Sequence, residues 1–176
     1  IDMAKKNAEL ALEKEITEKQ EADAKGVRLL SHMQEELGTA KPPKRIECFD
    51  ISNIQGTDNV ASMVVFEDGQ PKKSDYRRFK IRGVEGVAND FASMKEVVGR
   101  RYSRLQKDEK PFPDLIIIDG GKGQLNAAVE ALDELNIKDI DIIGLAKKQE
   151  EVYKPGNPRP LLLSRRSEAL LVLQRT

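Results

Sequence analysis

The sequence has little of the material that several common kinds of active site require. It contains one cysteine and one histidine in 176 residues, so it can form no internal disulfide and has little material for multi-histidine metal sites or histidine-based catalysis. It has no tryptophan and only 5% aromatic residues, so base stacking is not expected to dominate any nucleic-acid binding. Lys and Arg number 30, as do Asp and Glu, which excludes a globally basic protein but not a local basic face.

Long apolar runs are also missing. No stretch reaches the roughly 18 uncharged apolar residues of a membrane span, so no membrane association is expected. No signal peptide is visible, and a lone cysteine suits a reducing compartment, which predicts a cytoplasmic protein. The chain begins at Ile1 rather than Met and stops at Thr176 within an apolar periodic run, so we expect a fragment of a longer protein. The oligomeric state is left open.

Residues 3–37 predict one long helix, because they are rich in Ala, Glu and Lys and their apolar residues recur at steps of three and four. The apolar stripe consists of Leu12, Ile16, Val27, Leu30, Met33 and Leu37. Gly38 and the prolines at 42–43 end it. The stripe needs a partner, either the following domain or a neighbouring chain. We therefore divide the chain into a helical linker segment, 1–44, and a domain, 45–176.

The domain opens with three predicted strands, at 46–52, 60–67 and 74–81. Short turns at 55–59 and 67–69 join them, which predicts an antiparallel meander. In the third strand, Arg78 and Lys80 alternate with Phe79 and Ile81.

Helices and strands then alternate. After a Gly-bounded loop at 82–86, a helix is predicted over 88–107, with an inner stripe of Phe91, Met94, Val98, Tyr102 and Leu105. The unbroken apolar run 115–118 is typical of a parallel strand buried on both faces. A helix at 124–135, a short strand at 139–146, a small hairpin within 152–163 and a last helix from about Ser167 complete the chain.

This order of elements predicts a mixed α/β fold. A parallel strand that follows a crossover helix can lie beside the first strand with the usual right-handed connection. We therefore expect a mixed five-stranded sheet in the order 3-2-1-4-5 with flanking helices, which is the ribonuclease H-like topology.

Two aspartates are the strongest candidates for chemistry. Asp50 lies inside the first strand, and Asp119 ends the most buried strand, where open α/β sheets place their sites. If these strands are neighbours, the two carboxylates converge, and a hard divalent cation such as Mg²⁺ or Mn²⁺ would offset their repulsion and activate water at a phosphate. The alternatives are structural, since Asp50 would serve as a turn cap or arginine partner and Asp119 as a helix cap.

A glycine-rich segment follows Asp119 directly. Gly120, Gly121, Lys122 and Gly123 open the next helix, where exposed N–H groups favour an anion and glycine allows close approach. The pattern is neither the nucleotide-binding G-x-x-x-x-G-K-[ST] loop nor G-x-G-x-x-G, so a nucleic-acid phosphate fits better than ATP. A tight strand-to-helix turn explains the same residues structurally.

The remaining candidates are weaker. Asp90 lies in the first turn of its helix, either complementing the helix dipole or supporting the two acids. Basic residues gather around Arg77 and Arg78 and at several later positions, where they form a solvated face or contact a phosphate backbone. His32 is expected on the surface. Cys48 shares the strand parity of Asp50 and is expected to be a small core residue.

Three segments together resemble the UvrC family, a subunit of the bacterial UvrABC excinuclease. They are Glu47-Cys48-Phe49-Asp50-Ile51-Ser52-Asn53, Tyr76-Arg77-Arg78-Phe79 and Ile118-Asp119-Gly120-Gly121-Lys122-Gly123-Gln124-Leu125. The resemblance covers about 45–176, and the preceding helical region fits the family as well. It implies a ribonuclease H-like endonuclease domain that makes the incision 5′ of a lesion in double-stranded DNA, after UvrA-dependent loading of UvrB.

The resemblance also implies roles for individual residues. Asp50 and Asp119 match the metal-binding catalytic acids, and Asp90 matches a further acidic position implicated in the 5′ incision. The family completes its site with a histidine in an R-D-E-x-H motif, into which Arg175 and Thr176 lead. Because this chain stops there, we expect the fragment to cut DNA weakly or not at all.

Two other functions are consistent with the residues. A ribonuclease H-like domain also serves as an inert protein- or DNA-binding module, although converging carboxylates would have no use in one. A nuclease of the same fold acting on deaminated or branched DNA is the other alternative.

Overall fold

The structure is a computed structural model that describes residues 2–53, 59–82, 89–146, 148 and 150–175. Apart from Asn59 and Arg82, the predicted turn at 55–59 and loop at 82–86 lie outside the described residues. In the described part, no helix is long and apolar enough to cross a membrane.

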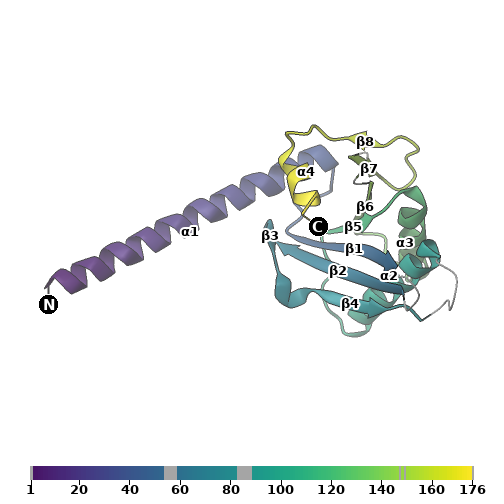
Figure 1. The fold of residues 1–176 in the computed structure, drawn as a ribbon, viewed down its shortest axis with the longest axis horizontal. Helices are drawn as coiled ribbons and strands as arrows, with labels where there is room; N and C mark the ends of the chain where they lie inside the picture. Colours follow the sequence, from purple (N-terminus) through teal and green to yellow (C-terminus); the bar gives the residue numbers. More distant parts are fainter. Residues whose placement is uncertain (1, 54–58, 83–88, 147, 149, 176) are drawn as a thin grey trace.

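One mixed sheet forms the centre of the domain (Figure 1). Its strands are β1 (Arg45–Asn53), β2 (Asn59–Glu67), β3 (Gln70–Pro71), β4 (Arg77–Lys80), β5 (Leu115–Asp119), β6 (Asp141–Ala146), β7 (Glu151–Tyr153) and β8 (Leu161–Leu162). β1 pairs antiparallel with β2 and parallel with β5, and β5 pairs parallel with β6. β7 and β8 continue the sheet antiparallel beyond β6.

The predicted strand order is confirmed for the five main strands, which lie in the order β4-β2-β1-β5-β6. The predicted number is wrong, since the described residues form eight strands. β3 and β4 share the outer edge of β2, and the predicted hairpin within 152–163 joins the sheet as β7 and β8. The strand expected at 74–81 is shorter, because Lys73–Asp75 forms a 3-10 turn before β4 begins.

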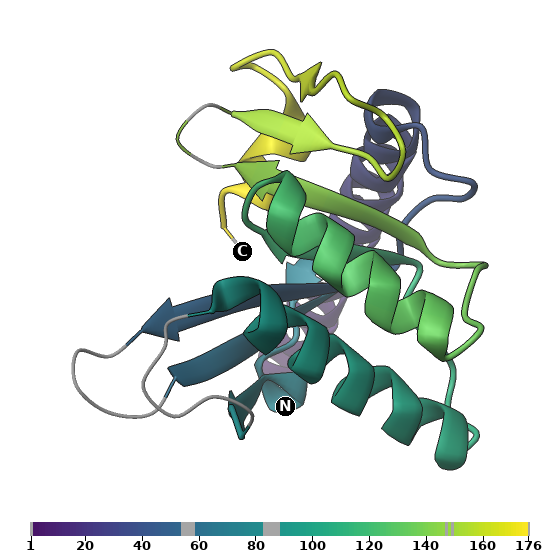
Figure 2. The ribbon, with the colours of Figure 1, turned by 90° about the vertical axis from the view of Figure 1, so that its right-hand side faces the viewer.

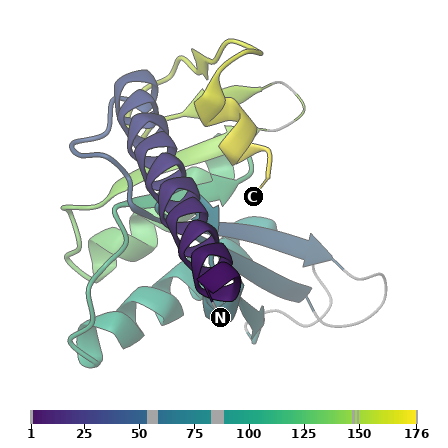
Figure 3. The same cartoon turned by 90° about the vertical axis from the view of Figure 1, so that its left-hand side faces the viewer.

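Helices cover both faces of the sheet. Figure 2 shows α2 (Asp90–Lys107) and α3 (Lys122–Glu134) side by side on one face, which we call the α2 face. Figure 3 shows α1 (Asp2–Leu37) crossing the other face with α4 (Glu168–Leu173) beside it, and we call this the α4 face. Each face has its own apolar core: Phe49, Ile116 and Ile118 belong to the core under α2, and Cys48 and Ile117 to the core under α4.

Only the C-terminal end of α1 is part of the domain. Leu30, Met33 and Leu37 are buried in the α4-face core, whereas the rest of the predicted stripe, Leu12, Ile16 and Val27, is exposed. The remainder of the helix projects away from the sheet (Figure 1). The prediction of one helix is therefore confirmed, and the following domain is the partner of the C-terminal part of its apolar stripe.

The inner stripe predicted for α2 is confirmed except at its first residue. Met94, Val98, Tyr102 and Leu105 are buried, but Phe91 is 56% exposed. Its ring lies against Gly123 at the start of α3, where an added Cβ atom would come within 2.5 Å of it. Phe91 therefore packs at the junction of two helix starts rather than under α2.

A buried carboxylate joins α2 to the central strand. Glu47 is fully buried in β1 and accepts hydrogen bonds from Nη2 and Nε of the Arg101 guanidinium, at 2.7 and 3.2 Å. The Tyr102 hydroxyl and Arg45 also donate to it, at 3.0 and 3.1 Å. Burial and the adjacent Glu47 charge raise the pKa of Tyr102, so its hydroxyl remains a donor. Glu47 is thus a charged residue held inside the core by complete pairing.

Replacing this carboxylate should destabilise the domain. We expect Glu47→Gln to lower the free energy of unfolding by about 3 kcal/mol or more, since Arg101 would lose its charged partner inside the protein. Urea denaturation followed by circular dichroism measures the effect. Glu67→Gln, at a half-exposed carboxylate that also pairs with Arg45, should cost at most about 1 kcal/mol. Equal losses in the two variants would contradict a structural role particular to Glu47.

Candidate active site

The parallel pairing of β1 and β5 brings the two candidate acids to one edge. The register pairs Cys48 with Ile117 and Phe49 with Ile118, and its next step sets Asp50 beside Asp119. Neighbouring strands lie about 4.8 Å apart, so the two residues are adjacent across the ladder. Both are half-buried. The predicted convergence of Asp50 and Asp119 therefore follows from the backbone register.

Both acids point to the α4 face. Side chains alternate along a strand, and Cys48 and Ile117, two residues before the acids, lie in the core under α4. Cys48 is itself a buried core residue, as predicted. The α4 helix starts at Glu168 and its buried residues, Ala169, Val172 and Leu173, pack in the same core. Residues that follow α4 therefore leave the sheet on the face toward which the acids point.

The donor set fits a hard divalent cation. Two adjacent carboxylates supply oxygen ligands of the kind Mg²⁺ and Mn²⁺ prefer, and Mg²⁺ ordinarily keeps several waters or phosphate oxygens in addition. Among the described residues, no group of three or more His, Cys, Asp or Glu side chains is arranged to hold a metal ion. Asp50 and Asp119 would thus act as a pair, with the remaining coordination positions open to water and substrate.

A row of polar side chains runs across the sheet from Asp50. Asp50 pairs with Ser62 of β2, and Ser62 pairs with Arg78 of β4. Cross-strand partners point to the same face, so Arg78 lies on the α4 face, about 10 Å and two strands from Asp50. Arg78 is exposed. Its position suits contact with a substrate phosphate next to the acid pair.

The neighbouring Arg77 points the other way. Its cross-strand partner Met63 lies in the core under α2, so Arg77 is on the α2 face. Its guanidinium donates to the carbonyl oxygens of Tyr76 and Ser74, at 2.8 and 3.2 Å. The structure thus separates two arginines that the sequence prediction treated as one group.

The glycine-rich segment forms a tight turn between β5 and α3. The Gly120 amide donates to the carbonyl oxygen of Leu145, and the Gly121 amide to Oε1 of Gln124. These two amides are therefore committed within the protein. Lys122 and Gly123 begin α3, where helix geometry offers the first amides no intrahelical acceptor. They are the better placed half of the predicted phosphate-binding segment.

The Lys122 side chain lies against the β7–β8 connection. Its ammonium group donates to the carbonyl oxygen of Pro158 and lies 5.4 Å from the centre of the Tyr153 ring. A phosphate contact by this ammonium would need the side chain to turn away from that connection. This contact joins residues far apart in the sequence, and no motif in the sequence indicates it.

The other predicted residues belong to helices rather than to the two strands that carry the acid pair. Asp90 is the first residue of α2, in the helical layer on the α2 face, and the helix is capped by the Asn89 side chain, which accepts from the Ala92 amide. Through Phe91 and Gly123, this helix start reaches the edge of the sheet where β5 ends. His32 is exposed on α1, with Nδ1 3.4 Å from the Glu168 carboxylate, which confirms its predicted surface position.

Sequence comparison identifies relatives of the chain. Residues 34–176 match the UvrC RNase H endonuclease domain family. The UvrABC system protein C of Porphyromonas gingivalis is 49% identical over 177 residues, and that of Flavobacterium psychrophilum 54% over 148 residues. These alignments cover 99% and 84% of this chain but only 29% and 24% of the two relatives. The chain thus spans less than a third of the length of the curated relatives it matches.

A comparison of folds finds more distant similarity. The chain resembles Ciona intestinalis endonuclease V in complex with an inosine-containing DNA, with a TM-score of 0.44 and 19% sequence identity. The match covers 75% of this chain and 57% of that one.

In the turn between β5 and α3, we expect Gly121 to accept an added methyl group and Gly120 not to accept one. A Cβ atom on Gly120 would lie 1.7 Å from Oε1 of Gln124, so Gly120→Ala must displace the amide that caps Gly121. We expect a loss of about 1 kcal/mol in the free energy of unfolding. Gly121 has an extended backbone and open space around its Cβ position, so Gly121→Ala is the matched control, with an expected change within about 0.5 kcal/mol. Thermal unfolding of both variants makes the comparison, and equal stability would contradict the capping role of Gln124.

Proposed function

The chain belongs to the UvrC RNase H endonuclease domain family, and on this basis we propose that it cuts DNA on the 5′ side of a lesion during nucleotide excision repair. The observation that supports this reaction is the acid pair, Asp50 and Asp119, adjacent in the β1–β5 ladder and directed to one face. An inert binding module would gain nothing from two neighbouring carboxylates, which repel each other by about 1 to 4 kcal/mol.

We propose that Asp50 and Asp119 hold Mg²⁺ or Mn²⁺ and that this metal dependence is part of the reaction. A divalent cation bound there would polarise the scissile phosphate and lower the pKa of a water molecule. The two carboxylates would hold the cation at a defined position, because both belong to strands that are paired inside the sheet. Arg78 supplies a positive charge for the same DNA strand, and the first amides of α3, at Lys122 and Gly123, lie beside Asp119 for a phosphate oxygen.

The wider assignment follows from the relatives. We propose damaged double-stranded DNA as the substrate, UvrB as the protein partner after UvrA-dependent loading, and the cytoplasm as the location. Residues 45–176 would form the nuclease domain together with the buried C-terminal end of α1, and the rest of 1–44 the helical segment that connects it to the rest of a longer protein. Asp90 is proposed as a supporting acid at the start of α2. The family completes its site with a histidine in an R-D-E-x-H motif, whereas the only histidine of this sequence is His32 in the N-terminal helix. We therefore expect the 176 residues alone to cut weakly.

Metal binding can be measured without any cutting. Mg²⁺ or Mn²⁺ should raise the unfolding temperature of the wild-type chain, since a ligand that binds the folded state stabilises it. Asp119→Asn should remove this shift, while Asp133→Asn, at an exposed position on α3, should keep it. A metal-induced shift that survives in Asp119→Asn would place the cation elsewhere.

The incision itself needs the chain within its full-length protein. The substrate is a damaged duplex loaded with UvrB and already nicked on the 3′ side of the lesion, in Mg²⁺. We expect cutting 5′ of the lesion, and Asp119→Asn should slow it by roughly a hundredfold or more, the size of effect that loss of metal-based charge stabilisation produces. Asp133→Asn should cut normally. Equal cutting by Asp119→Asn and wild type, or no cutting by either, would remove Asp119 from the mechanism and favour the inert module.

A further inference from the structure

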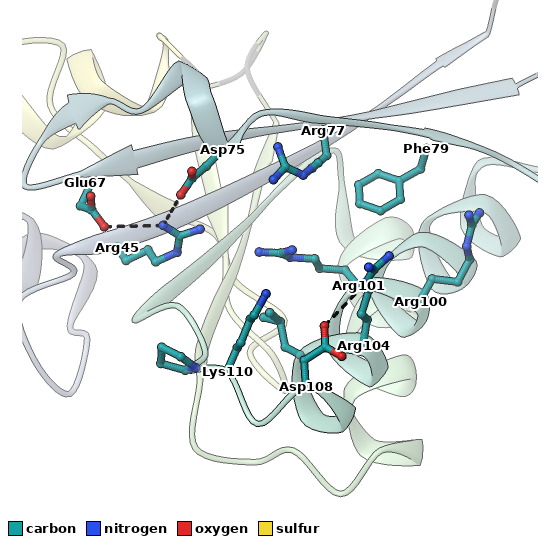
Figure 4. Close-up of a pocket in the computed structure, with 12 residues that line it drawn as sticks. Arg45, Glu67, Asp75, Arg77, Phe79, Arg100, Arg101, Arg104, Asp108 and Lys110 are labelled. Carbon is teal, nitrogen blue, oxygen red and sulfur yellow. Dashed lines mark hydrogen bonds and ion pairs between the residues drawn. The ribbon is translucent and has the colours of Figure 1, made fainter.

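A basic groove lies between β4 and α2, on the face of the sheet opposite to the acid pair (Figure 4). It has a volume of about 520 Å³ and is lined by six basic side chains, against carboxylates at Glu67, Asp75 and Asp108. A second hollow of about 500 Å³ continues it along α2, sharing Arg100, Arg104 and Asp108 and adding the basic residues Arg82 and Lys107. The two hollows form one surface, which we call the α2 groove.

The positive charge of the α2 groove exceeds what its acidic neighbours compensate. Arg45 and Arg101 are occupied by Asp75 and Glu47, and Figure 4 shows Arg45 bonded to Asp75 and Glu67. Arg100 is paired with Glu96 at 3.1 Å. The positive charges of Arg77 and Arg104 are not neutralised in this way. Arg77 donates to carbonyl oxygens, which carry no net charge, and Arg104 is 81% exposed with Asp108 at 3.6 Å. An exposed ion pair at that separation is weak and easily exchanged.

The cations of α2 form a line rather than a cage. Arg100, Arg104 and Lys107 are spaced by four and three residues, so they lie on one side of the helix and span about 10 Å along its axis. The groove is open along this line, since the second hollow continues the first. A row of cations matches a polyanion with regularly repeated charges better than it matches one compact anion.

The edge strand connects this groove to the acid face. Consecutive residues of β4 point to opposite faces, so Arg77 enters the α2 groove while Arg78 lies in the row that leads to Asp50. A phosphate backbone that passes around β4 would meet a guanidinium on each side of the sheet. Because the acid pair is on the other face, a segment held in the groove cannot be the segment being cut.

We propose that the α2 groove binds a nucleic-acid phosphate backbone away from the scissile bond. This inference rests on the proposed function, of which it specifies a second DNA contact. Arg77, Arg104 and Lys107 contact phosphates through their charge, without reading bases. The groove adds affinity that depends strongly on salt and is independent of sequence.

The test measures DNA binding by this chain in EDTA, where no metal-dependent cutting occurs. Fluorescence anisotropy of a labelled duplex is followed over a series of salt concentrations for wild type, Arg104→Ala/Lys107→Ala and Arg77→Ala. The α2 positions are exposed in a helix, where alanine is well tolerated. Lys19→Ala/Arg28→Ala on the exposed part of α1 is the matched control, since it removes the same two charges from another helix.

We expect the groove variants to weaken binding at least tenfold at low salt. The slope of log affinity against log salt should fall by about two for Arg104→Ala/Lys107→Ala and by about one for Arg77→Ala. The α1 control should keep the wild-type affinity and slope.

Three results would overturn the groove as a DNA contact. One is wild-type affinity and slope in the groove variants, and another is the absence of DNA binding by the wild-type chain at low salt. The third is displacement of the duplex by polyglutamate as effectively as by unlabelled DNA at equal charge, which would identify a surface for acidic polypeptides. None of these depends on Asp119, so the incision assay with Asp119→Asn judges the proposed function separately.

Discussion

The parallel pairing of β1 with β5 is the constraint on which the candidate site depends. It connects segments about 70 residues apart in the chain, Ile46 with Leu115 being the first pair, and it sets Asp50 beside Asp119. Because side chains alternate along a strand, a slip of one residue would send one acid into the opposite core. The apolar residues on either side, buried on both faces, make such a slip costly.

Glu47 strengthens this constraint from the other face. In β1, residues 46, 48 and 50 point to the α4 face, whereas Arg45, Glu47 and Phe49 point to the α2 face. Arg101 and Tyr102, which hold this buried carboxylate, both belong to α2 and therefore lie on the α2 face. The charged cluster under α2 therefore helps to determine which residues of β1 are left to face the substrate, although it takes no part in the chemistry.

Most of the strands and helices could be predicted from the sequence, because the spacing of apolar residues indicates where each element lies. The apolar patterns located the strands and helices along the chain, and the order of these elements predicted the central strand order. Polar contacts between distant segments could not be predicted. The residues around Glu47 do not indicate that α2 supplies its partner, and those around Lys122 do not indicate its contact with Pro158. The exposed position of Phe91 was missed for a related reason, since helical periodicity does not say where the neighbouring layer ends.

The shape of α1 has a consequence for whatever is attached to it. Its C-terminal end, from Gly26 to Leu37, packs on the domain, while residues 2–25 extend outward as helix for about 35 Å. A helix fixed at one end transmits angle as well as distance: each residue inserted or removed rotates the far end by about 100° and shifts it by about 1.5 Å. Changes in the length of this helix would thus alter the orientation of an attached module about the helix axis more strongly than its distance from the domain. The number of residues therefore matters mainly through the helical rotation it adds.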